Sequence, residues 1–197
     1  DIISGFQVAG SDDEEMKKRI ACESCPGFGS CGGMFTYNTM QTFIGVMGLE
    51  PLHMIAPPSD DRRRLDQFPS ELVNYLQAMI ESQVTPRDIV NRDSIRNAMI
   101  VAMAIGGSTN VLLHGPEIAR AAGVRDFSGD IMSPEEFNHL SQHVVPVLID
   151  ARPFGSYSMV DIDEKGGVQL IVKELLNAGL LNGDTLTCTG ETLAEQI

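Results

Sequence analysis

Basic residues are scarce in this sequence: 14 lysines and arginines stand against 27 aspartates and glutamates, a formal net charge of −13 over 197 residues. A chain this acidic is poorly suited to holding nucleic acid or an anionic membrane surface by charge, so we expect neither as a partner. A small anionic substrate remains compatible, because a local pocket can be positive on an acidic protein. Long apolar runs are also missing, and without a run of about 18 apolar residues the sequence predicts no membrane-spanning helix.

Cysteines are few and unevenly spread. Cys22, Cys25 and Cys31 lie within ten residues, and Cys188 stands far from them. This is not the pattern of a small secreted disulfide framework. The opening DIISGFQVAGSDDEE has neither the basic nor the apolar region of a signal peptide. We therefore expect a protein of the reducing cytoplasm.

Helical patterns dominate the chain, and short apolar segments lie between them. The segment RNAMIVAMAI at 96–105 is apolar on all sides, which is typical of a buried helix. Two segments, VVPVLID at 144–150 and DTLTCTG at 184–190, are strand candidates. Helices interleaved with such strands predict an α/β fold, a helix-rich layered domain with a small, mostly parallel sheet. The expected helices cover about 12–23; 34–48, stopped by Gly48; a segment whose buried face is Leu72, Val73, Leu76, Met79 and Ile80; 95–105, capped by Asp93 or Ser94; 109–122, stopped by Gly123; one begun by Ser133 and Pro134; and one from 168, stopped by Gly179.

The stretch CPGFGSCGG at 25–33 has two literal motif matches, and both are weak. Its glycines match the dinucleotide fingerprint GxGxxG, but a charged helical stretch precedes them where a strand is needed. An NAD-binding enzyme is therefore disfavoured. Its cysteines, together with Cys22, resemble a metal knuckle, but a zinc site needs four ligands and the nearest histidine, His53, lies beyond the next helix.

Cys31 differs from the other cysteines, which we interpret as free and buried. It lies in a glycine-rich turn directly before a predicted helix. Exposed amides and the positive end of the helix dipole stabilise a thiolate there, and the glycines let a bulky group approach the backbone. These surroundings suit a nucleophile or a ligand to a metal cluster. None of the four histidines shows a local signature of pairing with Cys31 as a base.

Four segments together resemble the dihydroxy-acid dehydratase and phosphogluconate dehydratase family, in family order and near family spacing. They are CPGFGSCGGMFTYNTM, TPRDIV, RNAMIVAMAIGGSTNVLLHGPEIARAAG and GLLNGDTLTCTGETLAEQ. The resemblance implies an iron–sulfur enzyme, also using Mg²⁺, that removes water from a 2,3-dihydroxy acid or sugar acid to give a 2-keto acid. It implies that Cys31 is a cluster ligand, and it leaves the cluster type, [2Fe–2S] or [4Fe–4S], open.

The resemblance also implies that the remaining machinery lies outside this segment. The family's other cluster cysteines, its Mg²⁺ ligands and its catalytic serine belong to motifs that are absent here, so we assign no catalytic residue to this chain. Residues 1–190 would be the later part of an N-terminal cluster-binding domain, and 191–197 the start of a linker to a C-terminal domain. We expect the full-length enzyme to be a homodimer or homotetramer. The alternative is a non-catalytic, cluster-free α/β scaffold or fragment.

Four polar residues are further site candidates. Thr36 and Asn38, close to Cys31, are candidates for contacts to the cluster or substrate, with ordinary helix positions as the rival interpretation. Ser108 and Thr109, in GGSTN, stand where a helix start can hold an anionic group, or simply cap that helix. We expect this turn to be delivered to the interior, where its helix start and that of Cys31 converge.

Overall fold

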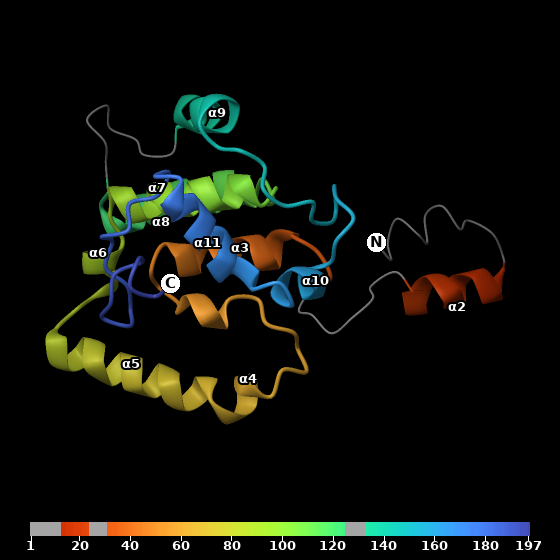
Figure 1. The fold of residues 1–197 in the computed structure, drawn as a ribbon, viewed down its shortest axis with the longest axis horizontal. Helices are drawn as coiled ribbons and strands as arrows, with labels where there is room; N and C mark the ends of the chain where they lie inside the picture. The colour runs from red at the N-terminus through yellow and green to blue at the C-terminus, as the bar shows by residue number, and fades with distance from the viewer. Residues whose placement is uncertain (1–12, 24–30, 125–132) are drawn as a thin grey trace.

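The structure of the chain, a computed structural model, describes residues 13–23, 31–124 and 133–197 (Figure 1). These parts are helical, and none of their helices is long and apolar enough to cross a membrane. In chain order the elements are α2 (Glu14–Glu23), α3 (Thr36–Val46), the 3-10 turn η1 (Leu52–Met54), α4 (Arg63–Asp66), α5 (Phe68–Ser82), α6 (Pro86–Ile89), α7 (Arg92–Ala104), α8 (Asn110–Ala122), α9 (Pro134–His143), α10 (Met159–Asp163) and α11 (Gly167–Asn177).

The core is built around α7. Nine of its 13 residues are buried, and it packs against α3, α8, α9 and α11. The expectation of a helix buried on all sides is confirmed, and it follows from the lack of a polar face. The predicted cap is wrong: Asn91, rather than Asp93 or Ser94, caps α7, and its side-chain oxygen accepts hydrogen bonds from the Asp93 and Ser94 amides at 2.9 and 3.0 Å.

Several helix ends lie where the sequence predicted them. Ser133 caps α9 by accepting a bond from the Glu136 amide at 3.1 Å. Gly48, Gly123 and Gly179 follow α3, α8 and α11 with φ of 100°, 77° and 69°, the left-handed conformation that glycine adopts most easily. Gly48 also has a steric role, because a Cβ there would lie 2.7 Å from the Leu186 carbonyl oxygen.

The predicted α/β fold is wrong. The described residues contain two isolated β-bridges, Ala151 with Tyr157 and Leu186 with Thr192, and no sheet. Residues 144–150 have no strand beside them; the Leu148 amide bonds instead to the Ala104 carbonyl at the end of α7, at 2.8 Å. Residues 184–190 belong to a tight turn in which the Thr187 amide donates to the Glu191 carbonyl at 3.0 Å. An apolar segment becomes a strand only when a second one pairs with it.

The predicted buried face of α5 is also wrong. Leu72, Val73, Leu76 and Ile80 are 47%, 62%, 58% and 69% exposed. The helix is attached mainly at its beginning, where Phe68 is buried and Glu71 bonds to His53 at 2.8 Å. The rest of α5 runs along the edge of the molecule, away from α3, α7 and α11 (Figure 1). The apolar spacing correctly indicated an amphipathic helix, but it does not say what covers that face.

Candidate functional site

The loop that carries Cys31 is held by the helix that follows it. The Asn38 side chain, 2% exposed, donates from Nδ2 to the Cys31 carbonyl at 3.0 Å and to the Gly33 carbonyl at 2.7 Å. Phe35, the N-cap residue of α3, supplies no side-chain capping bond among the described contacts. The position of the Cys31 backbone is therefore set from within α3.

A second segment holds the same loop from outside. The Met34 amide donates to the Arg152 carbonyl at 2.7 Å, and the Met159 amide donates to the Gly32 carbonyl at 3.1 Å. Gly33 has to be a glycine, because a Cβ there would lie 2.8 Å from the Arg152 carbonyl oxygen. Cys31 is half-buried. The loop that it begins is held by Asn38 from α3 and by the backbone of Arg152 and Met159 from the second segment.

The turn 106–110 lies against α3. Gly106 has φ of 64°. At the end of α7, the Gly107 amide donates a hydrogen bond to the Ala102 carbonyl at 2.8 Å. A Cβ on Gly107 would lie 2.8 Å from the Thr39 methyl carbon, so the glycine permits close contact with α3. The Ser108 amide then donates to the Thr39 hydroxyl at 2.9 Å.

A second bond joins the turn to the start of α3. Asn110 donates from Nδ2 to the Thr36 hydroxyl at 2.7 Å and to the Ser108 hydroxyl at 3.1 Å. The Asn110 amide also donates to the Ser108 hydroxyl, at 3.3 Å. The structure therefore connects Thr36, Asn38 and Ser108 to the Cys31 loop or the turn. Thr109 stands at the N-cap of α8 without a side-chain capping bond among the described contacts.

Two residues of this network were not among the predicted site residues. Thr39, fully buried, bonds to both the loop and the turn, since its hydroxyl also donates to the Met34 carbonyl at 3.3 Å. Asn110 was weighed as part of the GGSTN turn but was not chosen as a site candidate. The local signal for Thr39 was the run of polar residues TYNT at the start of the helix, because buried polar side chains need partners.

The arrangement brings together the starts of two helices, because the first residue of α8, Asn110, bonds to the first residue of α3, Thr36. Backbone N–H groups and the positive dipole ends of α3 and α8 favour an anion. Thr36 and Thr109 are exposed, and Cys31 and Ser108 are partly exposed, so none of these four side chains is fully buried.

Among the residues that the structure describes, Cys22 and Cys188 do not complete a metal site with Cys31. Cys22 is exposed, contrary to expectation, while Cys188 is buried as expected. Burial raises the pKa of the Cys188 thiol to about 11, so it stays protonated at neutral pH. Cys25 lies outside the described residues. Among the residues that the structure describes, no group of three or more histidines, cysteines or carboxylates could hold a metal ion. The described part of the chain thus offers one thiol suited to act as a ligand, and no complete site for a cluster or for Mg²⁺.

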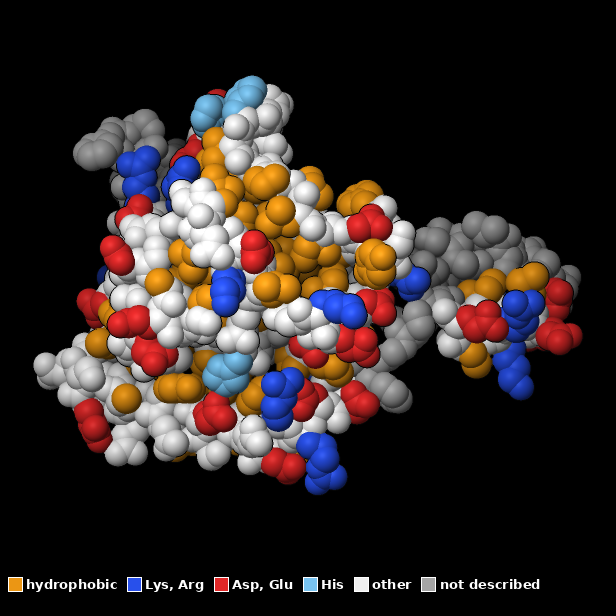
Figure 2. Space-filling view, in the orientation of Figure 1, with side chains coloured by type: hydrophobic (Ala, Val, Ile, Leu, Met, Phe, Trp, Pro, Cys, Tyr) orange, Lys and Arg blue, Asp and Glu red, His pale blue; other side chains and the backbone are white. Residues whose placement is uncertain are grey.

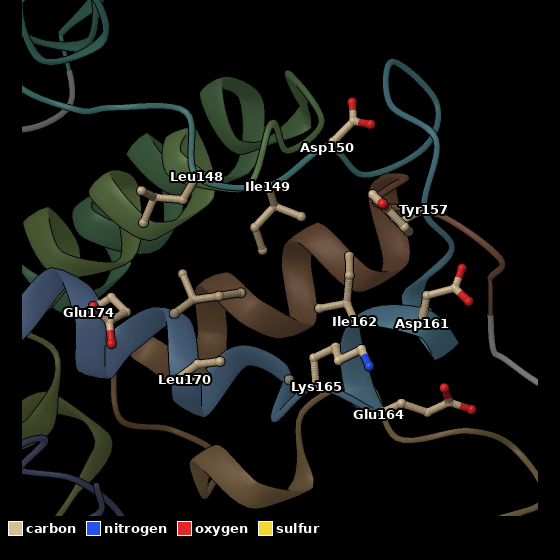
Figure 3. A pocket seen from close by; sticks show the side chains of 12 residues that line it. Leu148, Ile149, Asp150, Tyr157, Asp161, Ile162, Glu164, Lys165, Leu170 and Glu174 are labelled. Atoms are coloured by element: carbon tan, nitrogen blue, oxygen red, sulfur yellow. The ribbon is translucent and has the colours of Figure 1, made fainter.

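A large cleft of about 850 Å³ lies between the segment 148–150 and helices α10 and α11 (Figure 3). Its apolar wall includes Leu148, Ile162 and Leu170, while its charged lining has a single cation, Lys165, against four carboxylates: Asp150, Asp161, Glu164 and Glu174. The Asp161 carboxylate accepts a hydrogen bond from the hydroxyl of Ser158, the N-cap residue of α10, and this bond lowers the pKa of the carboxyl. An acidic lining disfavours an anionic acid, so we place the candidate site at the two helix starts instead.

Comparison with known proteins agrees with the sequence motifs. The family model described as dihydroxy-acid/6-phosphogluconate dehydratase N-terminal matches residues 4–196. The chain is 44% identical over 201 residues to a dihydroxy-acid dehydratase of Leifsonia xyli subsp. xyli, covering 100% of this chain and 34% of that protein. It is 40% identical to the chloroplastic dihydroxy-acid dehydratase of Arabidopsis thaliana, over 100% of this chain and 32% of the relative. The chain thus spans about a third of the length of the curated relatives it matches.

Proposed function

Because this chain belongs to the dihydroxy-acid/6-phosphogluconate dehydratase family, matching the model of its N-terminal region, we propose that the complete protein is a hydro-lyase. It removes water from a 2,3-dihydroxy acid or sugar acid and forms a 2-keto acid. Relatives that are 40% and 44% identical carry the name dihydroxy-acid dehydratase, which favours the first substrate class. The supporting structural observation is the hydrogen-bonded contact between the Cys31 loop and the turn 106–110.

In this proposal Cys31 contributes one ligand to an iron–sulfur cluster, which would supply a Lewis acid for the departing hydroxyl group. The half-exposed thiol in a loop fixed on both sides fits that role. The other cluster ligands, the Mg²⁺ ligands and the general base come from outside the described residues. The helix starts at Thr36 and Ser108 would face the substrate, and their N–H groups would favour its carboxylate.

The domain boundary, the partners and the location belong to the same proposal. We place residues 1–190 in the later part of a cluster-binding domain and 191–197 at the start of a connection to a C-terminal domain. Leu193, beyond that boundary, is fully buried against the body of the chain. The complete protein would act on a small hydroxy acid as a cytoplasmic homodimer or homotetramer.

The test is made on the complete protein, prepared without oxygen. Iron and sulfide per chain and 2-keto acid formation from a panel of 2,3-dihydroxy acids and sugar acids are measured for the wild type, Cys31→Ser and Cys22→Ser. We expect Cys31→Ser to lose iron and turnover, and the exposed Cys22→Ser to keep both. A wild type without iron or turnover would favour a non-catalytic scaffold, and full iron in Cys31→Ser would refute the assignment of the ligand.

A further inference from the structure

We propose that Asn38 and Thr39 are positioning residues: they set where the Cys31 thiol lies relative to the turn 106–110. The inference rests on the proposed function, since it assigns them a role in presenting a cluster ligand. They are adjacent, nearly inaccessible polar residues on α3, 2% and 0% exposed. Burying two polar side chains side by side costs free energy unless every hydrogen-bonding group finds a partner.

Asn38 acts on the loop and not on the helix. Its amide group has two N–H donors, and the carbonyls of Cys31 and Gly33 accept from that nitrogen at 3.0 and 2.7 Å. A capping side chain would instead accept bonds from free helix N–H groups. The bonds of Asn38 therefore fix the backbone on both sides of Gly32, next to the thiol, and do not serve to start α3.

Thr39 connects the loop to the turn through a single hydroxyl group. The hydroxyl has one proton and donates it to the Met34 carbonyl at 3.3 Å, while its oxygen accepts from the Ser108 amide at 2.9 Å. Its methyl group fills the space beside Gly107, where a Cβ would come within 2.8 Å of it. A shift of the turn at Ser108 would therefore act through the Thr39 hydroxyl on Met34, which lies at the end of the Cys31 loop.

The Thr36–Asn110 bond makes a second, more exposed connection, between the start of α3 and the turn, at 2.7 Å. Two connections, one buried and one near the surface, resist rotation of the turn about α3 better than either alone. Groups that orient a metal ligand from behind commonly change metal affinity by 10–100-fold when they are removed.

Helix α3 offers a matched control. Thr42 is as buried as Thr39, but its hydroxyl has no hydrogen-bond partner among the described residues. The substitutions Thr39→Val and Thr42→Val make the same change of shape and chemistry one turn apart. Only the first removes the connection between the loop and the turn.

The experiment compares Thr39→Val, Thr39→Ser, Asn38→Asp and Thr42→Val in the complete protein. Iron per chain and the visible circular dichroism of the cluster are recorded in the holoprotein. In the iron-free form, the alkylation rate of Cys31 is measured by mass spectrometry, with the exposed Cys22 as an internal reference. We expect Thr39→Val and Asn38→Asp to bind iron about 10-fold more weakly and to alkylate at Cys31 several-fold faster. Thr39→Ser, which keeps the hydroxyl, and Thr42→Val should resemble the wild type in both measurements.

Equal behaviour of Thr39→Val and Thr42→Val would overturn the inference. If Thr39→Val does not fold, Thr39→Ala against Thr39→Ser makes the same comparison with the hydroxyl as the only difference. The alkylation rate separates this inference from the proposed function. A wild type without iron would refute the function, whereas an unchanged Cys31 alkylation rate in Thr39→Val would refute the positioning role whether or not iron binds.

Discussion

Two buried threonines of α3 show that the contribution of a polar side chain to stability depends on its hydrogen-bond partners. The hydroxyl of Thr39 makes two hydrogen bonds, and that of Thr42 makes none with the described residues. A buried hydroxyl without a partner keeps its desolvation cost and gains nothing in return.

The first prediction follows from Thr42. Replacement by valine keeps the branched shape and removes the unpaired oxygen, so Thr42→Val should raise the free energy of unfolding by about 1 kcal/mol. Urea denaturation followed by circular dichroism measures this, with Thr39→Val as the comparison expected to be less stable than the wild type. A loss of stability in Thr42→Val would mean that the hydroxyl has a partner, such as a buried water.

Glu50, just after α3, predicts a pH dependence of stability. Burial raises the pKa of its carboxyl, and the hydrogen bond from Gln41 at 2.7 Å opposes that shift. A carboxyl whose folded pKa is raised holds its proton more tightly in the folded state. Its contribution to stability is therefore present below the ordinary pKa of 4.5 and is lost as pH rises through the folded pKa.

Glu50→Gln, which cannot ionise, should accordingly be more stable than the wild type at neutral pH, and this gain should shrink as the pH falls toward 4.5. Unfolding free energies at several pH values between these limits test this, with Glu174→Gln as the same substitution at an exposed position for comparison. A gain that does not depend on pH would show that ionisation of Glu50 is not its cause.

At the scale of elements, local signals predicted local structure. Ser133 marks the start of α9 by a side-chain bond, and Gly123 marks the end of α8 by a positive φ. Both signals involve only neighbouring residues, so the sequence predicts them well. The apolar run 95–105 predicted the buried α7 because a helix without a polar face has to be covered by other elements. Cys31 and the turn 106–110 were expected to approach each other. In the structure the Thr39 hydroxyl bonds to the Met34 carbonyl and to the Ser108 amide, which lies 69 positions away.

Two predictions that depended on contacts between one element and another were wrong. Residues 144–150 have the composition of a strand, but pairing is decided by a second segment, and none is present among the described residues. The sequence correctly predicted that α5 has an apolar face, but the prediction that this face is buried was wrong. The periodicity of a sequence says which residues lie together, not what lies opposite them.

The cap of α7 gives a prediction at this scale. Asn91 accepts bonds from two amides at the start of the most buried helix, so Asn91→Ala should lower the free energy of unfolding by about 1–2 kcal/mol. Asn91→Asp keeps the accepting oxygen and should remain close to the wild type. Chemical denaturation of both variants is the measurement. Equal losses would indicate that the Nδ2 group, rather than the cap, carries the effect.

At the scale of the whole molecule, this chain leaves much apolar surface uncovered. In addition to the apolar face of α5, hydrophobic side chains gather between α9 and α11 in Figure 2. Val147 and Leu148 are also exposed. Contiguous apolar surface of this kind is characteristic of contact regions. Such surface accords with a chain that covers about a third of its relatives.

The last prediction is that residues 1–197 alone hold no stable cluster and do not dehydrate hydroxy acids. Iron–sulfur clusters are normally held by several cysteines. Cys31 is one thiol in a fixed loop, Cys188 is buried and protonated, and the described residues offer no group of three metal ligands. The isolated chain and the complete protein would be reconstituted in parallel with iron and sulfide, desalted, and analysed for iron and for keto acid formation. The complete protein should retain iron and turn over while the isolated chain does neither. A stable cluster on the isolated chain would mean that Cys22 and Cys25 act with Cys31 after all, and turnover would mean that the general base also lies within these 197 residues.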